Sequence, residues 1–130
     1  MTPGSDRGHE QVPGVTEGWP RSGVHRFPEP FARVARVLAE RGWDVAVVPP
    51  SRTDPQLWDG LAAALHLPAW FGRNLDALDE VLADRRRPTA LVLASWWAYA
   101  TARPDRWAAL LQLLQERAAG QPPLVVVLAD

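Results

Sequence analysis

Three short apolar runs, far apart along the chain, constrain the fold more than any other feature. They are Val45–Val48, Ala90–Ala94 and Leu124–Ala129. Each is apolar almost throughout, which is typical of strands covered on both faces in a parallel sheet. Parallel neighbours need long crossover connections, and helical patterns fill both gaps between the runs. The sequence therefore predicts an α/β fold of right-handed βαβ units, with a three-stranded parallel sheet flanked by helices.

The segments around the runs carry helix signals. Thr53 is followed three residues later by a Gln, which predicts a capping box, and Asn74 suits the N-cap of a further helix. Pro104 suits the first turn of a long helix, and Gly120 suits its end. An additional N-terminal helix is predicted over residues 30–41, and a short helical turn over Trp96–Thr101.

Length and composition set the domain organisation. The chain has 130 residues, 47% of them hydrophobic, which suffices for one domain with its own core. Residues 1–30 contain five Pro and five Gly among polar residues, so residues 1–27 are predicted to be a disordered or loosely attached leader. The domain is predicted over residues 28–130, with its core over 44–130.

Composition also excludes several function classes. The chain has no Cys, and all fourteen of its basic residues are Arg, which excludes thiolate and lysine nucleophiles. The net charge of −1 gives no overall field for nucleic acid. The three histidines, at positions 9, 25 and 66, are scattered, and no apolar run reaches the ~20 residues of a membrane span. We expect a cytoplasmic protein with no catalytic residue, cofactor, metal, nucleic acid or membrane partner.

One predicted helix carries a row of acids. Asp76, Glu80 and Asp84 are spaced four residues apart and share one face, with Asp79 beside them. Like charges at this spacing repel each other, and no Arg within the helix lies four residues from Asp76 or Glu80. Two interpretations stay open: a solvated face of which Asp76 favours the helix dipole, or a surface for a cationic partner.

Two aromatic residues, Trp70 and Phe71, precede this helix in a loop between a Pro and a Gly. Both suit a place in the core. If Trp70 is exposed instead, an aromatic anchor lies beside the carboxylates, and that pairing suits a partner rich in cations and histidine.

The string Trp-Phe-Gly-Arg-Asn-Leu-Asp-Ala-Leu, at residues 70–78, resembles the signature of the barstar family, intracellular inhibitors of secreted microbial ribonucleases. The order of elements from about Asp44 onward is similar as well. The resemblance implies a barstar-like three-stranded parallel sheet, and inhibition by a helix and its preceding loop that plug the ribonuclease active site. It also implies a 1:1 complex with the enzyme.

The resemblance also assigns roles to particular residues. It places Trp70 against the catalytic histidine of the enzyme and Glu80 in the phosphate pocket, where the family has an Asp. Asp76 matches the first helix acid of the family, and Glu116 matches a further acid late in the last long helix. The predicted ribonuclease-binding residues are Trp70, Gly72, Asn74, Leu75, Asp76, Asp79, Glu80, Asp84 and Glu116.

Some residues depart from the family pattern. Asp79 stands where the family has an aromatic residue, and Glu80 is longer than the family's Asp. The three arginines Arg85–Arg87 directly follow the acidic helix and oppose a cationic enzyme if they face it. These differences favour a target other than barnase itself, or a lower affinity.

Two alternatives remain beside the inhibitor. A bacterial immunity or adaptor protein of the same fold would bind a different toxin or partner without inhibiting a ribonuclease, and Trp96, Trp97 and Tyr99 would give it a second surface. The same aromatic residues equally suit packing around the last strand. Nucleic-acid binding would rest on Arg85–Arg87, although arginines at a helix C-terminus also suit a solvated end. The inhibitor is expected to be a monomer when free.

Overall fold

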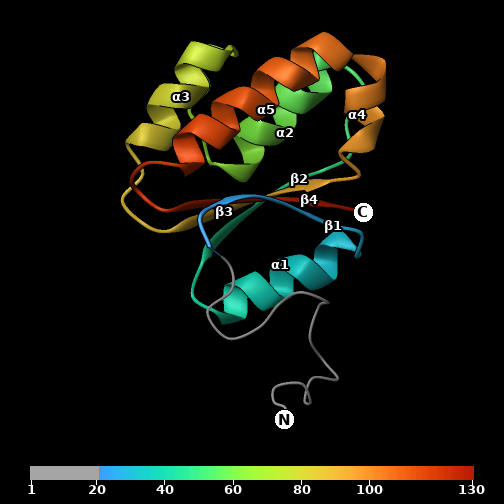
Figure 1. The fold of residues 1–130 in the computed structure, drawn as a ribbon. Coiled ribbons are helices and arrows are strands. Elements are labelled where there is room, and N and C mark those ends of the chain that lie inside the picture. The colour runs from blue at the N-terminus through green and yellow to red at the C-terminus, as the bar shows by residue number, and fades with distance from the viewer. Residues whose placement is uncertain (1–20) are drawn as a thin grey trace.

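The computed structural model describes residues 21–130 and has a sheet of four parallel strands. The spatial order of the strands is β1-β4-β3-β2, so the last strand along the chain lies next to the first. Figure 1 shows the sheet between two helical layers. The strands are β1 (Gly23–Phe27), β2 (Asp44–Val48), β3 (Thr89–Ala94) and β4 (Leu124–Ala129).

The three predicted strands are confirmed, and the two central ones are buried throughout. Alternate residues of β4 face opposite sides of the sheet. Leu124, Val126 and Leu128 belong to the larger of two cores, whereas Val125 and Val127 belong to the smaller one. A strand that is covered on both faces has no polar position, which explains its continuous apolar sequence.

The predicted strand count of three is wrong, because β1 adds a fourth strand along β4. The predicted leader over residues 1–27 is therefore wrong for Gly23–Phe27, whereas residues 1–20 lie outside the described part of the chain. β1 is an edge strand and only partly buried, with polar His25 and Arg26 in it. An edge strand of this kind lacks the continuous apolar run by which the other strands are recognised.

Within residues 21–130, five helices cover the sheet. One packs on the smaller core, and the other four form the layer over the larger core, as Figure 1 shows. The predicted helix over 30–41 is confirmed, as is the short helix after β3. The helices are α1 (Phe31–Glu40) on one face, and α2 (Asp54–Ala64), α3 (Leu75–Ala83), α4 (Trp97–Ala102) and α5 (Pro104–Ala118) on the other.

Both predicted caps are formed. The Thr53 side chain accepts a hydrogen bond from the backbone N–H of Gln56, and the Gln56 side chain accepts one from the backbone N–H of Thr53, which completes the capping box of α2. The Asn74 Oδ1 accepts a hydrogen bond of 2.8 Å from the backbone N–H of Ala77. These caps fix where α2 and α3 begin, and so fix which side chains each helix presents.

Candidate functional site

The loop before α3 separates its two aromatic residues. Phe71 is buried and packs against Trp58 of α2, with ring centroids 6.2 Å apart. Its backbone N–H donates to the Pro68 carbonyl at 3.0 Å, which tightens the turn. Trp70 is 85% exposed. The loop therefore anchors itself with one aromatic ring and presents the other to solvent.

Gly72, Arg73 and Asn74 connect this loop to α3. A Cβ at Gly72 would lie 3.3 Å from the Asn74 Nδ2, so a side chain there would press on the residue that caps the helix. Arg73 Nη1 donates to Asp59 Oδ1 at 2.5 Å, which ties the loop to α2. Leu75 is half-buried and packs on the larger core. The loop is thus fixed at both ends, to α2 and to α3.

The acidic row of α3 faces solvent, as its spacing predicts. Leu78 and Leu82 are buried on the inner face of the helix, and Asp76, Glu80 and Asp84 are exposed on the outer face. None of these three carboxylates forms an ion pair with another residue in the range 21–130. The outer face of α3 therefore presents negative charge that the rest of the described structure leaves uncompensated.

Asp79 differs from these three acids. The Arg117 guanidinium on α5 donates two hydrogen bonds to Asp79 Oδ1, at 3.0 Å from Nε and 2.8 Å from Nη2. This pair joins α3 to α5 and compensates the Asp79 charge. The partner is 38 residues away in sequence, so helical spacing gave no signal for it.

Glu116 directly precedes Arg117 on α5. Its side chain is exposed, and its Oε2 accepts a hydrogen bond of 3.2 Å from Gln112 Nε2. Since α5 packs along α3 (Figure 1), the structure places Glu116 on the helix adjacent to the acidic row. We call the acids of α3 together with Glu116 and Arg117 of the adjacent α5 the acidic face: Asp76, Asp79, Glu80, Asp84 and Glu116, with Arg117.

The three arginines after α3 do not act as one group. Arg85 is half-buried and donates to Asp44 Oδ2 and to Thr89 Oγ1, both at 2.5 Å, at the start of β2 and β3. Arg86 and Arg87 are exposed. Arg85 thus holds the loop to the sheet, and Arg86 and Arg87 remain exposed after the end of α3.

A polar cluster at the other end of the helical layer was not predicted. Asp54, in the first turn of α2, accepts a hydrogen bond of 2.6 Å from the Tyr99 hydroxyl and one from Arg106 Nη1, and Arg103 lies 3.9 Å away. Burial of Tyr99, its hydrogen bond to Asp54 and the Asp54 charge together raise the pKa of Tyr99 to about 12. The cluster joins α2, α4 and α5.

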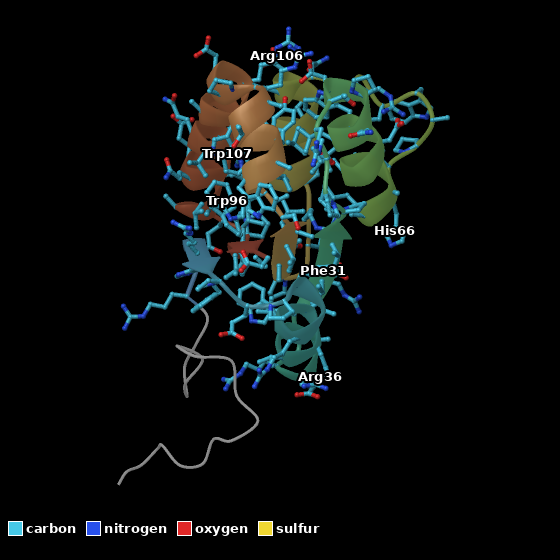
Figure 2. All side chains as sticks on the ribbon, turned by 90° about the vertical axis from the view of Figure 1, so that its right-hand side faces the viewer. Phe31, Arg36, His66, Trp96, Arg106 and Trp107 are labelled. Atoms are coloured by element: carbon cyan, nitrogen blue, oxygen red, sulfur yellow. The ribbon has the colours of Figure 1, made fainter. Side chains whose placement is uncertain are left out.

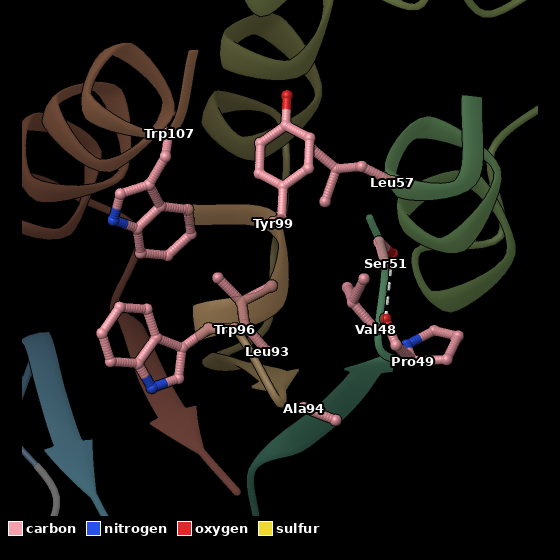
Figure 3. A pocket seen from close by; sticks show the side chains of 9 residues that line it. All are labelled: Val48, Pro49, Ser51, Leu57, Leu93, Ala94, Trp96, Tyr99 and Trp107. Atoms are coloured by element: carbon pink, nitrogen blue, oxygen red, sulfur yellow. Dashed lines mark hydrogen bonds between the residues drawn. The ribbon is translucent and has the colours of Figure 1, made fainter. Parts of the chain in front are cut away.

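The tryptophans near α4 pack mostly against each other. Trp96 stacks on Trp107 with ring centroids 5.4 Å apart, and the Arg26 guanidinium lies 5.3 Å from the Trp96 ring centroid. Figures 2 and 3 show this pair at the edge of the helical layer. Tyr99 is 4% exposed and Trp97 is 51% exposed. The alternative of aromatic packing therefore holds for Trp96 and Tyr99, and only Trp97 is left largely on the surface.

Neither a metal centre nor a membrane span is found in the described range. Over residues 21–130, no three His, Asp or Glu side chains are placed to hold a metal ion together. Within the same range, no helix has the length and apolar character to cross a bilayer.

The fold and the site define a class: a parallel α/β domain that presents an acidic helix face and an exposed tryptophan in the loop before that helix. Residues 49–128 match the family described as Barstar (barnase inhibitor). The chain therefore belongs to the barstar family, whose members are inhibitors and not enzymes. No curated protein matches the chain. The family match begins after β2, so β1, α1 and β2 lie outside it.

Proposed function

We propose that the chain inhibits a secreted microbial ribonuclease, barnase-like or guanyl-specific, by binding its active site one to one through α3 and the preceding loop. The observation that carries the proposal is the exposed row of Asp76, Glu80 and Asp84, which has no ion pair within residues 21–130, together with the exposed Trp70 in the loop before α3. Membership of a family of barnase inhibitors supports it.

The chemistry of the target explains why such a face inhibits. A ribonuclease active site gathers Arg, Lys and His to hold a phosphodiester and its transition-state charge. Carboxylates held in place by a folded helix can occupy the same positions as the phosphates. Complementary fields also speed association, so binding weakens as salt increases.

The proposed roles are those that the resemblance to the barstar family implies for each residue. Glu80, in the middle of the exposed row, enters the phosphate pocket, and Asp76 binds beside it. Trp70 packs on the catalytic histidine. Glu116 and Asp84 extend the charge at the edges, Asp79 contributes through its pair with Arg117, and the loop contacts come from Gly72, Asn74 and Leu75.

The proposal also gives the inhibitor its place in the cell. A secreted ribonuclease threatens the RNA of the bacterium that makes it before export, so its inhibitor acts in the cytoplasm as an immunity protein. We expect the free protein to be a monomer, because the acidic face repels a second copy of itself.

The test is titration of the protein into RNA-cleavage assays of barnase and several guanyl-specific ribonucleases, at low and high salt. We expect stoichiometric inhibition that weakens with salt. Glu80→Ala should weaken binding most, by more than tenfold, followed by Asp76→Ala and then Glu116→Ala. Glu40→Ala is the matched control, because Glu40 is an exposed acid on α1, across the sheet from α3.

Two results would count against the proposal. Equal, negligible losses from all three substitutions would refute the assigned face. Absence of inhibition of every enzyme by the folded protein would favour an immunity or adaptor protein for a different toxin.

A further inference from the structure

A pocket of about 230 Å³ lies between α2, the start of α3, α4 and α5, beside the acidic face but separate from its row of acids. Helices α2 and α5 each contribute residues at helical spacing, so one face of each turns toward the same space. The residues that line it are Asp54, Leu57, Trp58, Arg73, Asn74, Leu75, Tyr99, Arg106, Ala109 and Leu110.

The interior of this pocket is apolar. Leu57, Tyr99 and Leu110 are buried in the core beneath it, and Trp58 and Leu75 are half-buried at its sides. The volume is below the ~300–1,000 Å³ of sites for drug-sized ligands. An apolar space of this size suits a single ring. By contrast, the neighbouring hollow drawn in Figure 3 measures about 10 Å³, which is the room for one water molecule.

The rim of the pocket is cationic. Arg73 comes from the loop and Arg106 from α5, and their side chains are 49% and 66% exposed. Each guanidinium donates through Nη1 to one carboxylate, Asp59 or Asp54. A guanidinium has five N–H donors in a planar fork that matches a carboxylate, so both retain donors for a further anion.

The one acid that lines the pocket, Asp54, does not cancel the attraction of the two arginines for an anion. Asp54 is the only carboxylate among the lining residues, and its oxygens already accept hydrogen bonds from Tyr99 and Arg106. A cationic ligand would therefore meet two arginines and an acid that is already bonded. The charge of the lining favours an anion.

We propose that this pocket binds a small aromatic carboxylic acid, with its ring in the apolar interior and its carboxylate bonded to Arg73 and Arg106. The lining includes none of the exposed acids of α3, but it shares Asn74 and Leu75 with the proposed ribonuclease-binding loop. A small acid there would contact Asn74 and Leu75, which form the start of α3.

The direct test is a ¹⁹F NMR titration with 4-fluorophenylacetate, with 4-fluorophenylacetamide as the uncharged ligand of the same shape. We expect saturable binding of the acid, at least fivefold tighter than that of the amide, and weaker at high salt. Arg73→Gln should weaken binding of the acid at least threefold while leaving that of the amide unchanged. No saturable binding by the folded protein, or equal affinity for acid and amide, would overturn the proposal.

A second pair of variants locates the site. Ala109 is exposed on α5 and lines the pocket, whereas Ala108 is exposed next to it and does not. We expect Ala109→Phe to abolish binding by filling the pocket, and Ala108→Phe to leave it intact, with urea unfolding confirming that both variants fold. Unchanged binding by Ala109→Phe would show that the acid binds elsewhere and would refute the assignment.

Discussion

Asp54 and Glu80 lie in the same helical layer, yet they use their charge in opposite ways. Asp54 is half-buried and bonded to the Tyr99 hydroxyl and to Arg106, so its charge joins three helices. Glu80 is exposed on α3 and has no ion pair within the described part of the chain. The comparison shows that an acid joins helices of this fold where an arginine reaches it, and stays exposed without an ion pair in the described structure where none does.

The largest effect on stability is expected at Asp54. Asp54→Ala removes the acceptor of a buried tyrosine hydroxyl and the partner of Arg106, and we expect it to lower the free energy of unfolding by about 3 kcal/mol. Urea unfolding monitored by tryptophan fluorescence measures this. The matched control is Asp59→Ala, which removes an exposed pair with Arg73 and should cost less than ~1 kcal/mol. Equal losses in the two variants would show that the Asp54 cluster has no special role.

The Asp54 cluster also predicts an alkaline transition. The pKa of Tyr99 is raised from its ordinary 10.0 to about 12 in the folded state, chiefly by burial and then by its bond to Asp54. The contribution of Tyr99 to the free energy of unfolding is therefore fully present below pH 10. It is lost as the pH rises toward 12, since the unfolded chain releases the tyrosine proton at a lower pH than the folded chain does. The chain has one Tyr and no Lys or Cys, so no other kind of side chain titrates in this window.

The measurement is the free energy of unfolding in urea between pH 9 and pH 12. We expect it to decrease across this range in the native sequence. Tyr99→Phe removes the titrating group and should flatten the profile, although its stability near pH 8 will be lower. A profile that stays equally steep in this variant would assign the transition to another cause.

A smaller effect is expected at Asp79, which lies on α3 like Glu80 but is paired with an arginine like Asp54. Asp79→Asn weakens its bonds to Arg117 and should lower the free energy of unfolding by about 1 kcal/mol, because the pair is only partly exposed and joins α3 to α5. Asp84→Asn, at the end of the same helix and unpaired, should cause no loss. A double-mutant cycle with Arg117→Gln should assign the Asp79 loss to this pair, and absence of coupling would contradict it.

The smallest effect has the opposite sign. Glu80 lies four residues from both Asp76 and Asp84, and like charges at this spacing destabilise a helix by a few tenths of a kcal/mol per pair. We expect Glu80→Gln to raise the free energy of unfolding by roughly 0.5 kcal/mol, and less at high salt, while it weakens ribonuclease inhibition. A variant that loses stability would show that the Glu80 charge serves the fold after all.

The features that the sequence predicts correctly all depend on neighbours along the chain. The capping box at Thr53 and the cap at Asn74 involve bonds over three residues, and the acidic row needs only the helical repeat. The buried strands β3 and β4 are recognised because a strand covered on both faces is apolar almost throughout, with Thr89 at the start of β3 as the exception.

The features that were missed depend on contacts between distant segments. Arg117 lies 38 residues from Asp79, and Arg106 lies 52 residues from Asp54, so no local pattern reveals either pair. The edge strand β1 falls within the predicted leader because residues 1–30 hold five Pro and five Gly among polar residues. Its pairing with β4 depends on a segment about 100 residues away. The exposure of Trp70 likewise depends on tertiary contacts, because Phe71 and not Trp70 packs against Trp58 of α2.

The position of β4 has a consequence for how the molecule is made. Among the four strands it is synthesised last, yet it lies in the middle of the sheet and pairs with both β1 and β3. Until residues 124–129 leave the ribosome, β1 has no strand to pair with. Both cores also lack the β4 residues that pack against β3 and the helices. Folding of the sheet must therefore wait for the end of this segment, and a nascent chain stalled before it presents an unfinished core to chaperones and proteases.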